Sequence, residues 1–468
     1  MTKRVGVAGL VVAVALGATW AMAQVEVSTV ALSKDYSPEE GFWYVRFNRP
    51  VVSDAAEQPV SFFARTRGVT SSKKGIFKDG PGRDDLGSTV VLVGDPSPDS
   101  RLFKMLSDPT MNAAGHVAFS TGLAGGANGV FRGDQSVVAL LGDSVPDVVG
   151  FLSWFSHVVI TEDEGVIFRA TISGAAEVGG VKVDQGIFRC SGGDGNCSSG
   201  TGSLEALVLR NDPVPDRPDR EICNINEAAA SNFGVAFVAE SKEDCADGDE
   251  LTRRGVFRVP FAGSIVTIAL EGEACEPYAD PGGTTYGLIW ALPDIANDGS
   301  VVFKARTTGI SLSTVLYLCL SSTCPPDPAE AKVITGTVDQ DGNVFSRFSL
   351  PAVSDAGDMA FKANARGDSG TVTGVYVRRA GATSDYPPET VVLQGDIVPD
   401  LVPATEFAQV LAKTSQLDMS PGGKIAFKAK VRRVNPPEVG LEGIFLVDVS
   451  GSPSGASLDM DRGVVPSP

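Results

Sequence analysis

The sequence predicts an all-β fold, a seven-bladed β-propeller in which every blade is a four-stranded sheet. Three observations lead to this prediction. The chain of 468 residues contains 53 Gly and 29 Pro, so frequent turns are expected and long helices are not. One phrase of short alternating segments recurs along the whole chain. Its last copy lacks a strand that the beginning of the chain supplies.

The repeated phrase is clearest at residues 348–400, and its copies follow at intervals of roughly fifty to seventy residues. Its second segment carries a phenylalanine, at Phe62, Phe119, Phe168, Phe237, Phe303, Phe361 and Phe427. A small residue stands two positions later in every copy, at Ala64, Thr121, Ala170, Ala239, Ala305, Ala363 and Ala429. Its third segment carries an aromatic residue, at Phe77, Phe131, Phe188, Phe257, Tyr317, Tyr376 and Phe445. Matches in the same order in every copy indicate a repeated structural unit.

Each unit alternates apolar and polar residues in short segments separated by turn signals, which indicates four strands, a to d. A lone four-stranded sheet leaves both faces exposed, whereas seven sheets around an axis bury them against each other. A linear β-solenoid is the alternative, although its repeats are usually shorter and more regular. Basic residues follow the strand b phenylalanine in several copies, and we expect them to point outward or to pair with acids, at Arg169, Lys304, Lys362 and Lys428.

The two ends of the chain predict how the ring closes. The seventh unit has strand a near 407–419, strand b at 425–429 and strand c at 443–449, but no fourth strand follows. Residues 30–39 align with residues 90–99, which are strand d of the first unit and the turn after it. We therefore expect the N-terminal strand to complete the seventh blade, which removes exposed sheet edges.

The repeat resembles that of bacterial exported proteins whose tandem repeats follow the phrase Asn-x-x-Gly-x-x-Ala-Phe. Residues 112–119 fit this phrase fully, with Asn112, Gly115, Ala118 and Phe119, and residues 420–427 depart from it only at the first position. The resemblance covers almost all of the chain after residue 23 and implies export and a repeat architecture, without a known activity. Such families often carry a C-terminal surface anchor, but residues 452–468 contain no apolar segment followed by basic residues.

The N-terminus and the charge predict compartment and partners. Residues 1–23 combine Lys3 and Arg4 with an apolar run and a small-residue cleavage site, as in a signal peptide. After its removal we expect no membrane span, a propeller at 24–449 and a disordered tail at 450–468. The net charge of −18 argues against nucleic-acid and anionic-membrane partners, which need clustered Lys and Arg. We expect a secreted or periplasmic monomer.

The seven cysteines of an exported chain favour disulfides over metal thiolates. Two pairs each bracket a short loop after an aromatic strand, and we expect both to be bonded, Cys190 with Cys197 and Cys319 with Cys324. The remaining three are expected to give one bridge and one buried thiol, from among Cys223, Cys245 and Cys275. A zinc site is less favoured, because histidines are scarce nearby.

An acidic turn of the form Gly-Asp-x-x-Pro-Asp follows strand d in several units. Its carboxylates are candidate ligand-binding groups, at Asp95, Asp99, Asp143, Asp147, Asp212, Asp216, Asp396 and Asp400. In a propeller these turns share one face with the variable loops between strands b and c, where their charges favour calcium or a cationic ligand. The competing interpretation is structural, because Asp in such turns commonly accepts backbone N–H hydrogen bonds.

Two further features are candidates for ligand binding. Asp339 and Asp341 open a segment similar to the start of a calcium loop, but the glutamate that an EF-hand needs is absent. Trp154 and Trp290 lie near the starts of inner strands. They either pack at the channel mouth or form platforms for sugar or peptide ligands.

Catalytic signatures are weak in this sequence. The two histidines, His116 and His157, are accompanied by no Ser or Cys nucleophile motif, and the Asp box of sialidase propellers is absent. A glycosidase that uses two carboxylates stays open, because the sequence does not show which acids meet in space. We predict a non-enzymatic exported protein that binds an extracellular glycan or protein through loops on one face. A polysaccharide hydrolase or lyase and a structural surface component are the alternatives.

Overall fold

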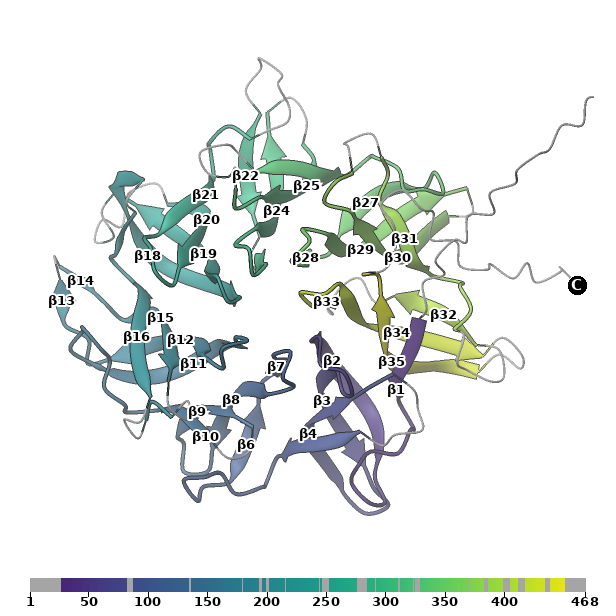
Figure 1. Cartoon of the computed structure of the whole chain (residues 1–468), viewed down its shortest axis with the longest axis horizontal. Coiled ribbons are helices and arrows are strands. Elements are labelled where there is room, and N and C mark those ends of the chain that lie inside the picture. The colour runs from purple at the N-terminus through teal and green to yellow at the C-terminus, as the bar shows by residue number, and fades with distance from the viewer. Residues whose placement is uncertain are drawn as a thin grey trace, which may run out of the picture.

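The structure is a computed structural model that describes residues 27–450, except 82–86, 134–135, 179, 193–195, 199–201, 215, 244, 246–251, 276–283, 291, 310–311, 323, 325–328, 369, 383–385, 399–404, 411–416 and 434–437. In these residues every regular element is a β-strand, and the strands form seven blades around a central axis (Figure 1). The predicted seven-bladed propeller is confirmed. The predicted signal peptide at 1–23, and all but the first residue of the predicted tail at 450–468, lie outside the described residues.

Each blade runs from an inner strand a beside the axis to an outer strand d, with antiparallel neighbours. Blade 1 contains β2 (Trp43–Val52), β3 (Val60–Arg67), β4 (Ser72–Asp79) and β5 (Ser88–Leu92). Blade 2 contains β6 (Phe103–Leu106) with β7 (Thr110–Met111), β8 (Val117–Leu123), β9 (Asn128–Arg132) and β10 (Ser136–Leu140). Blade 3 contains β11 (Phe151–Ile160), β12 (Val166–Ser173), β15 (Gln185–Ser191) and β16 (Ser203–Leu209), with a hairpin of β13 (Glu177–Val178) and β14 (Val181–Lys182) in its b–c loop.

The remaining blades follow the same plan. Blade 4 contains β18 (Arg217–Ala230), β19 (Gly234–Lys242), β20 (Arg253–Pro260) and β21 (Val266–Leu270), with β17 (Pro213–Val214) beside β18. Blade 5 contains β22 (Thr285–Ile289) with β23 (Asp294–Ile295), β24 (Val301–Thr308), β25 (Thr314–Cys319) and β26 (Glu330–Ile334). Blade 6 contains β27 (Val344–Phe348) with β28 (Ala352–Val353), β29 (Met359–Gly367), β30 (Gly370–Arg378) and β31 (Glu389–Leu393). Blade 7 contains β32 (Thr405–Val410) with β33 (Asp418–Met419), β34 (Lys424–Arg433), β35 (Glu438–Asp448) and the N-terminal β1 (Val27–Leu32).

The ring closes through the N-terminal strand, as predicted. Strand β1 pairs antiparallel with β35, so that Val27 lies opposite Val447 and Leu32 opposite Gly443. In Figure 1 the purple β1 lies beside the yellow C-terminal strands. Blade 7 therefore combines the two ends of the chain, and β35 has a partner on its outer side.

The repeated aromatic residues form the core of each blade. The strand b and strand c aromatics lie directly opposite each other in every blade, as Phe361 and Tyr376 do in blade 6. Their rings stack with centroids 5.1–6.2 Å apart. An inner-strand aromatic such as Phe345 packs edge-on against the strand c ring in five blades, and stacked or edge-on pairs are worth about 0.5–1.5 kcal/mol beyond their burial.

A glycine two residues before the strand c aromatic is required by close packing in six of the blades. At Gly374, an added Cβ would lie 2.7 Å from a methyl carbon of Leu393 in strand d and 2.8 Å from the carbonyl oxygen of Val392. The same approach is found at Gly75, Gly129, Gly186, Gly255 and Gly443. The repeated glycine thus lets the outer strand come close to the aromatic stack.

The basic residues after the strand b phenylalanine join neighbouring blades. Lys304 of blade 5 donates to the carbonyl oxygen of Phe348 in blade 6 at 2.7 Å, and Lys428 of blade 7 donates to that of Phe47 in blade 1 at 2.5 Å. Lys362 is fully buried and donates to the carbonyl oxygen of Lys428 at 3.2 Å. The prediction that these side chains point outward is wrong, because carbonyl groups of the next blade are within reach. The alternative, pairing with an acid, is confirmed for Lys428, which contacts Glu442. Burial, and then the charge of Lys428, lowers the pKa of Lys362 to about 7.

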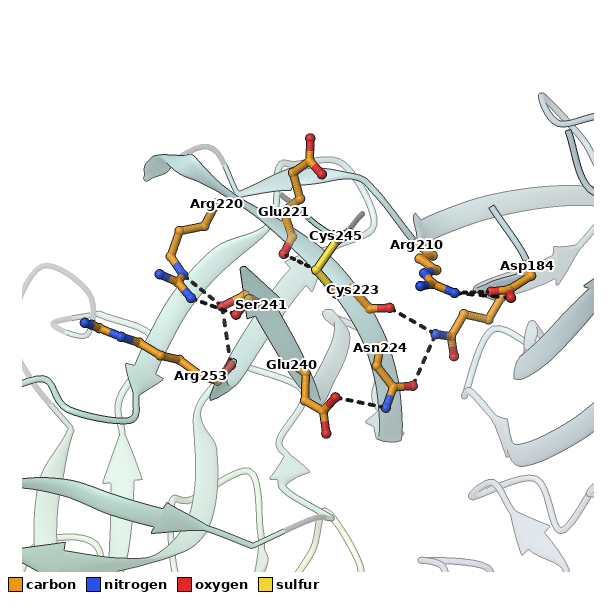
Figure 2. The surroundings of a disulfide bond; sticks show 11 residues. Asp184, Arg210, Arg220, Glu221, Cys223, Asn224, Glu240, Ser241, Cys245 and Arg253 are labelled. Carbon is orange, nitrogen blue, oxygen red and sulfur yellow. Dashed lines mark hydrogen bonds and ion pairs between the residues drawn. A yellow bond between two sulfur atoms is a disulfide. The ribbon is translucent and has the colours of Figure 1, made fainter. Parts of the chain in front are cut away.

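Three disulfides form in the described residues. The two predicted pairs, Cys190–Cys197 and Cys319–Cys324, are confirmed, and Cys223 pairs with Cys245, leaving Cys275 as a buried thiol. Figure 2 shows the Cys223–Cys245 bond between β18 and the loop after β19. The bonds are consistent with an extracellular or periplasmic protein. A helix of the length and apolarity needed to cross a membrane is not found within the described ranges.

Candidate functional site

A cavity lies on the axis, where the C-terminal ends of the inner strands of all seven blades meet. Its volume is about 400 Å³, within the range of about 300–1,000 Å³ typical of small-molecule sites. Its wall is built from short segments at 49–52, 107–111, 157–162, 228–232, 292–297, 350–355 and 417–421. The acidic turns that follow strand d precede the inner strands, so they lie at the opposite end of the channel.

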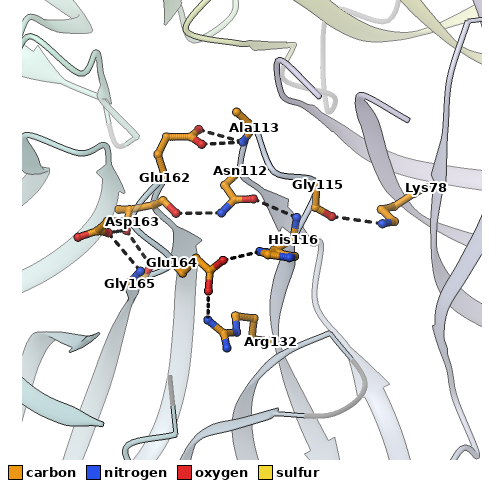
Figure 3. A network of polar contacts seen from close by, with 11 residues as sticks. Lys78, Asn112, Ala113, Gly115, His116, Arg132, Glu162, Asp163, Glu164 and Gly165 are labelled. Carbon is orange, nitrogen blue, oxygen red and sulfur yellow. Dashed lines mark hydrogen bonds and ion pairs between the residues drawn. The ribbon is translucent and has the colours of Figure 1, made fainter. Parts of the chain in front are cut away.

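The turns after the inner strands are joined from blade to blade around the cavity mouth. Figure 3 shows the link between blades 2 and 3, where both carboxylate oxygens of Glu162 accept the backbone N–H of Ala113, at 2.8 and 3.0 Å. Glu162 donates its own N–H to the side chain of Asn232 at 2.8 Å, and Asn232 donates to Asn297 at 3.0 Å. Asn297 donates to Asp355 at 2.8 Å. Each of these side chains holds the equivalent residue of the preceding blade.

The series continues through blade 7 to blade 1. Pro421 has no side-chain acceptor, and its backbone carbonyl accepts the N–H of Asp355 at 3.0 Å instead. Asp54 of blade 1 then accepts the N–H of Gly422 in blade 7 at 2.8 Å. In blade 2 the equivalent residue is Ala113, whose methyl group cannot accept a hydrogen bond from blade 1. We call these turn residues, from 54 to 421, the turn ring.

A second set of hydrogen bonds joins the blades one layer deeper in the wall. Here a side chain near the end of one inner strand accepts a backbone N–H from the next blade. The pairs are Thr110 with Ile160, Asp294 with Val353, and Asp418 with Val52, at 3.2, 2.9 and 2.9 Å. The repeat thus places polar side chains where other copies carry Val or Ala.

The charged centre of the cavity wall contains Arg49, Asp294 and Asp418. Arg49 forms an ion pair with Asp418 at 2.9 Å, with side chains 32% and 19% exposed. Burial raises the pKa of Asp418, although Arg49 opposes this rise. Burial, and then the charge of Asp418, raises the pKa of Asp294 to about 7. At neutral pH this pair of acids therefore shares less than two negative charges.

The cavity wall also contains the titratable residues Glu162 and His157, besides Asp108 and Asp355. Burial raises the pKa of Glu162, and the carboxylates of Asp54 and Asp355 add to this rise, although the N–H of Ala113 opposes it. Burial, and then the charge of Arg169, lowers the pKa of His157 to about 4, so its imidazole is neutral at pH 7. His116 is exposed, lies outside the cavity wall and pairs with Glu164 at 3.1 Å (Figure 3).

The raised pKa of Asp294 predicts a pH-dependent stability. A carboxyl whose pKa is higher in the folded state contributes stability below its unfolded pKa, near 3.9, and loses it as the pH rises through about 7. In Asp294→Asn the amide oxygen can still accept the N–H of Val353, but no charge forms. We expect the difference in free energy of unfolding between the variant and the wild type to shift by about 2 kcal/mol in favour of the variant as the pH rises from about 5 to about 8. Urea unfolding measures this difference. It is smaller than the full pKa shift implies, because the carboxyl is partly exposed. A difference that does not change with pH contradicts the assignment.

The structure gives the predicted acidic turns a hydrogen-bonding role. The first Asp of each turn accepts the backbone N–H of the leucine three residues earlier, at 2.6–2.9 Å, for Asp95, Asp143, Asp212 and Asp396. Asp35 does the same in β1, as its alignment with Asp95 implies. These contacts support the structural interpretation of the first Asp. Ligand binding by these turns stays a prediction.

The second Asp of the turn has no common role. Asp99 pairs with Arg101, which lowers its pKa against the opposing effect of burial, and Asp216 accepts from the N–H and hydroxyl of Thr267. Asp147 adopts a positive φ of 61°, and Asp400 lies outside the described residues.

The proposed calcium loop is occupied by its own hydrogen bonds. One oxygen of Asp339 accepts the N–H groups of Asp341 and Asn343, at 2.9 and 2.8 Å, and the other accepts from the hydroxyl of Tyr376. Asp341 is exposed and accepts from Thr390 at 3.3 Å. In the part of the chain that the structure describes, no three His, Cys, Asp or Glu side chains gather as metal ligands would.

The two tryptophans have different surroundings. Trp154 is 55% exposed on the inner strand of blade 3 and lines a second pocket of about 200 Å³ between blades 2 and 3. Trp290 is partly buried and carries Lys304 over its ring, at 4.5 Å. Only Trp154 is therefore open enough to serve as a platform.

Sequence reasoning missed the residues of the cavity wall. Asp294 and Asp418 occupy the same place in their repeats as Val51 and Ala352, so an acid at an apolar position was the available signal. Arg49 and Glu162 gave no signal of this kind, because the residue type at their positions varies from copy to copy, with no shared pattern from which they depart.

A family model described as a family of unknown function, DUF7453, matches residues 11–198 and 327–459. No curated protein sequence matches the chain significantly.

Several solved structures are similar to this chain in overall arrangement. Polysaccharide lyase Uly1 is 8% identical, with 91% of this chain and 99% of that chain covered and a TM-score of 0.38. The β-propeller domain of Cps50 (Swd1) from Myceliophteria thermophila is 10% identical, with 86% and 98% covered and a TM-score of 0.33. A PQQ-bound aldose sugar dehydrogenase from Streptomyces coelicolor is 11% identical, with 74% and 96% covered and a TM-score of 0.30. At such identities and scores we transfer no residue role from them.

Proposed function

The chain belongs to the DUF7453 family of unknown function, and from the chemistry of its cavity we propose that it is an exported binding protein for an extracellular glycan. The bound unit would carry hydroxyl groups and a protonated amine. Binding, rather than catalysis, would be the primary activity.

The acceptor-rich wall of the cavity carries this proposal. Carboxylates of Glu162, Asp294, Asp355 and Asp418 line it, and Arg49 is the one Lys or Arg among the described lining residues. Arg49 is already paired with Asp418. A carboxylate has about four lone-pair positions, and the backbone N–H groups fill only some of them. The wall therefore favours a ligand that brings donors and positive charge, and disfavours an anionic one.

Chito-oligosaccharides with and without N-acetyl groups test the proposal by isothermal titration calorimetry. We expect the deacetylated form, which carries amines, to bind at least about tenfold more tightly, a difference of about 1.4 kcal/mol. Glu162→Gln should weaken this binding, whereas Glu205→Gln, a change at an exposed position on β16, should leave it unchanged. Equal affinity for both forms, or equal effects of both variants, would exclude the proposed site.

Polysaccharide hydrolysis is a second candidate, which the pKa of Asp294 favours. A carboxyl with a pKa of about 7 beside a second carboxyl suits a general acid. Cleavage of a polysaccharide by the wild type, lost in Asp294→Asn while binding is retained, would identify catalysis. Turnover that Asp294→Asn leaves intact would place any active site elsewhere.

A further inference from the structure

The opposite end of the channel has a different chemistry. Every inner strand has an irregularity just after a buried apolar or aromatic residue near its start, where the pairing with strand b shifts by one, after Tyr44, Phe103, Leu152, Ile222, Tyr286, Phe345 and Phe407. Such bulges turn side chains away from the regular alternation. The residues that follow the shift stand at one level of the channel, at Arg46, Met105, Trp154, Asn224, Leu288 and Arg347.

Cations gather at this level on four consecutive blades. Strand b adds more of them directly beside the inner strands, since Arg65 lies opposite Arg46 and Arg306 lies opposite Leu288. We call the exposed cations of this region the basic arc, which runs through blades 5, 6, 7 and 1 with Arg306, Arg347, Arg366, Lys430, Arg46, Arg65 and Arg67.

Within the described residues the basic arc has no neutralising partner. In the described ranges none of its seven side chains makes a hydrogen bond or ion pair, although the chain contains 57 Asp and Glu against 39 Lys and Arg. Like charges directly opposite each other, as in Arg46 and Arg65, destabilise a sheet. The acid at the equivalent place in blade 4, Glu240, already contacts Asn224 and Arg254. An acidic chain that leaves these cations unpaired has an uncompensated positive site for an external anion.

An apolar pocket adjoins the arc on the next two blades. The pocket has a volume of about 200 Å³. Its wall includes Met105 and Trp154, which are 65% and 55% exposed, together with Gly122 and Asn128. An exposed indole beside small and polar groups suits the face of a sugar ring. The guanidinium groups of blade 1 stand at the same level of the channel on the neighbouring blade, and they suit carboxylate or sulfate groups, which they can bind in a bidentate manner.

From the unpaired basic arc and the adjoining Trp154 pocket we propose that this end of the channel binds an anionic polysaccharide. The arc crosses four blades, which fits an extended chain of charges rather than a single small anion. The three disulfides favour an extracellular polyanion over a nucleic acid. This site is separate from the cavity, so the two proposals stand or fail independently.

Binding of defined polymers to the protein from residue 24 onward tests the proposal. The probes are polygalacturonate, which carries carboxylates, dextran sulfate, which carries sulfates, neutral dextran and single-stranded DNA. We expect at least one anionic polysaccharide to bind, with an affinity that falls as salt rises, and dextran not to bind. The double variant Arg46→Gln/Arg65→Gln should lower the affinity at least tenfold, and Trp154→Ala should also lower it.

The matched control is Lys182→Gln/Lys332→Gln, which removes the same charge from β14 and from the outer strand β26, away from the basic arc. We expect it to bind like the wild type, and Glu162→Gln to leave polyanion binding unchanged. If the two double variants lose affinity for the polyanion equally, binding depends only on the net charge of the protein, and the proposal is overturned. Tighter binding of DNA than of either polysaccharide, or no binding of either, would also overturn it.

Discussion

Removal of β1 is expected to abolish the folded propeller. Its four apolar residues Val27, Val30, Ala31 and Leu32 are at most 2% exposed. Burial of a Val or Leu side chain is worth about 1.5–3 kcal/mol, so the loss approaches the total stability of a typical domain, about 5–15 kcal/mol. The deletion also exposes the edge of β35. A chain that begins at Tyr36 should therefore be aggregated or unfolded by circular dichroism and size-exclusion chromatography.

A synthetic peptide of residues 24–35 provides the control for this experiment. If β1 acts by completing blade 7, the peptide should restore a cooperative melting transition when it is added during refolding. A peptide with Val30 and Leu32 replaced by Ser should not. A truncated protein that melts like the intact one would show that closure contributes little.

Loss of the Arg49 guanidinium is the second large effect that we expect. In Arg49→Met the carboxylates of Asp418 and Asp294 lose the cation that faces them in a partly buried site. Breaking a buried ion pair costs about 3–5 kcal/mol, and partial exposure reduces this to about 2 kcal/mol here. Urea unfolding near neutral pH measures the change. Acid should reduce it, because protonation removes the charges that Arg49 compensates.

The double variant Arg49→Met/Asp418→Asn separates charge from packing. With both charges removed, most of the lost stability should return, and the coupling in the double-mutant cycle should exceed 1 kcal/mol, roughly the scale of contacting residues. Additive effects would mean that Arg49 stabilises the wall through its apolar stem alone.

The fold was predictable because its core repeats. In nearly every blade the residues equivalent to Phe361, Tyr376 and Gly374 have the same neighbours. The same packing therefore requires the same residue types in each copy, and the sequence shows them as a repeat. The alignment of residues 30–39 with 90–99 held for the same reason, since Asp35 and Asp95 make the same hydrogen bond.

The cavity was not predictable in this way, because its chemistry lies in the differences between copies. Asp294 and Asp418 come from blades 5 and 7, and their mutual repulsion exists only when the ring is closed. The repeat shows that Asp294 and Asp418 occupy equivalent positions, but it does not show that a cavity on the axis lies between their strands. The basic arc was hidden for a related reason: the net charge of −18 describes the whole chain, whereas unpaired cations collect where strands from four blades converge.

The channel wall also bears on how such a protein could evolve. At one register of the inner strands, five blades place four residue types on the cavity, at Arg49, Asp108, His157, Leu292 and Leu350. None of these belongs to the aromatic and glycine core, so this register can vary by single mutations at a smaller cost than the core, although Arg49 contributes to stability through its ion pair. Members of this family can therefore share every blade and differ in what they bind.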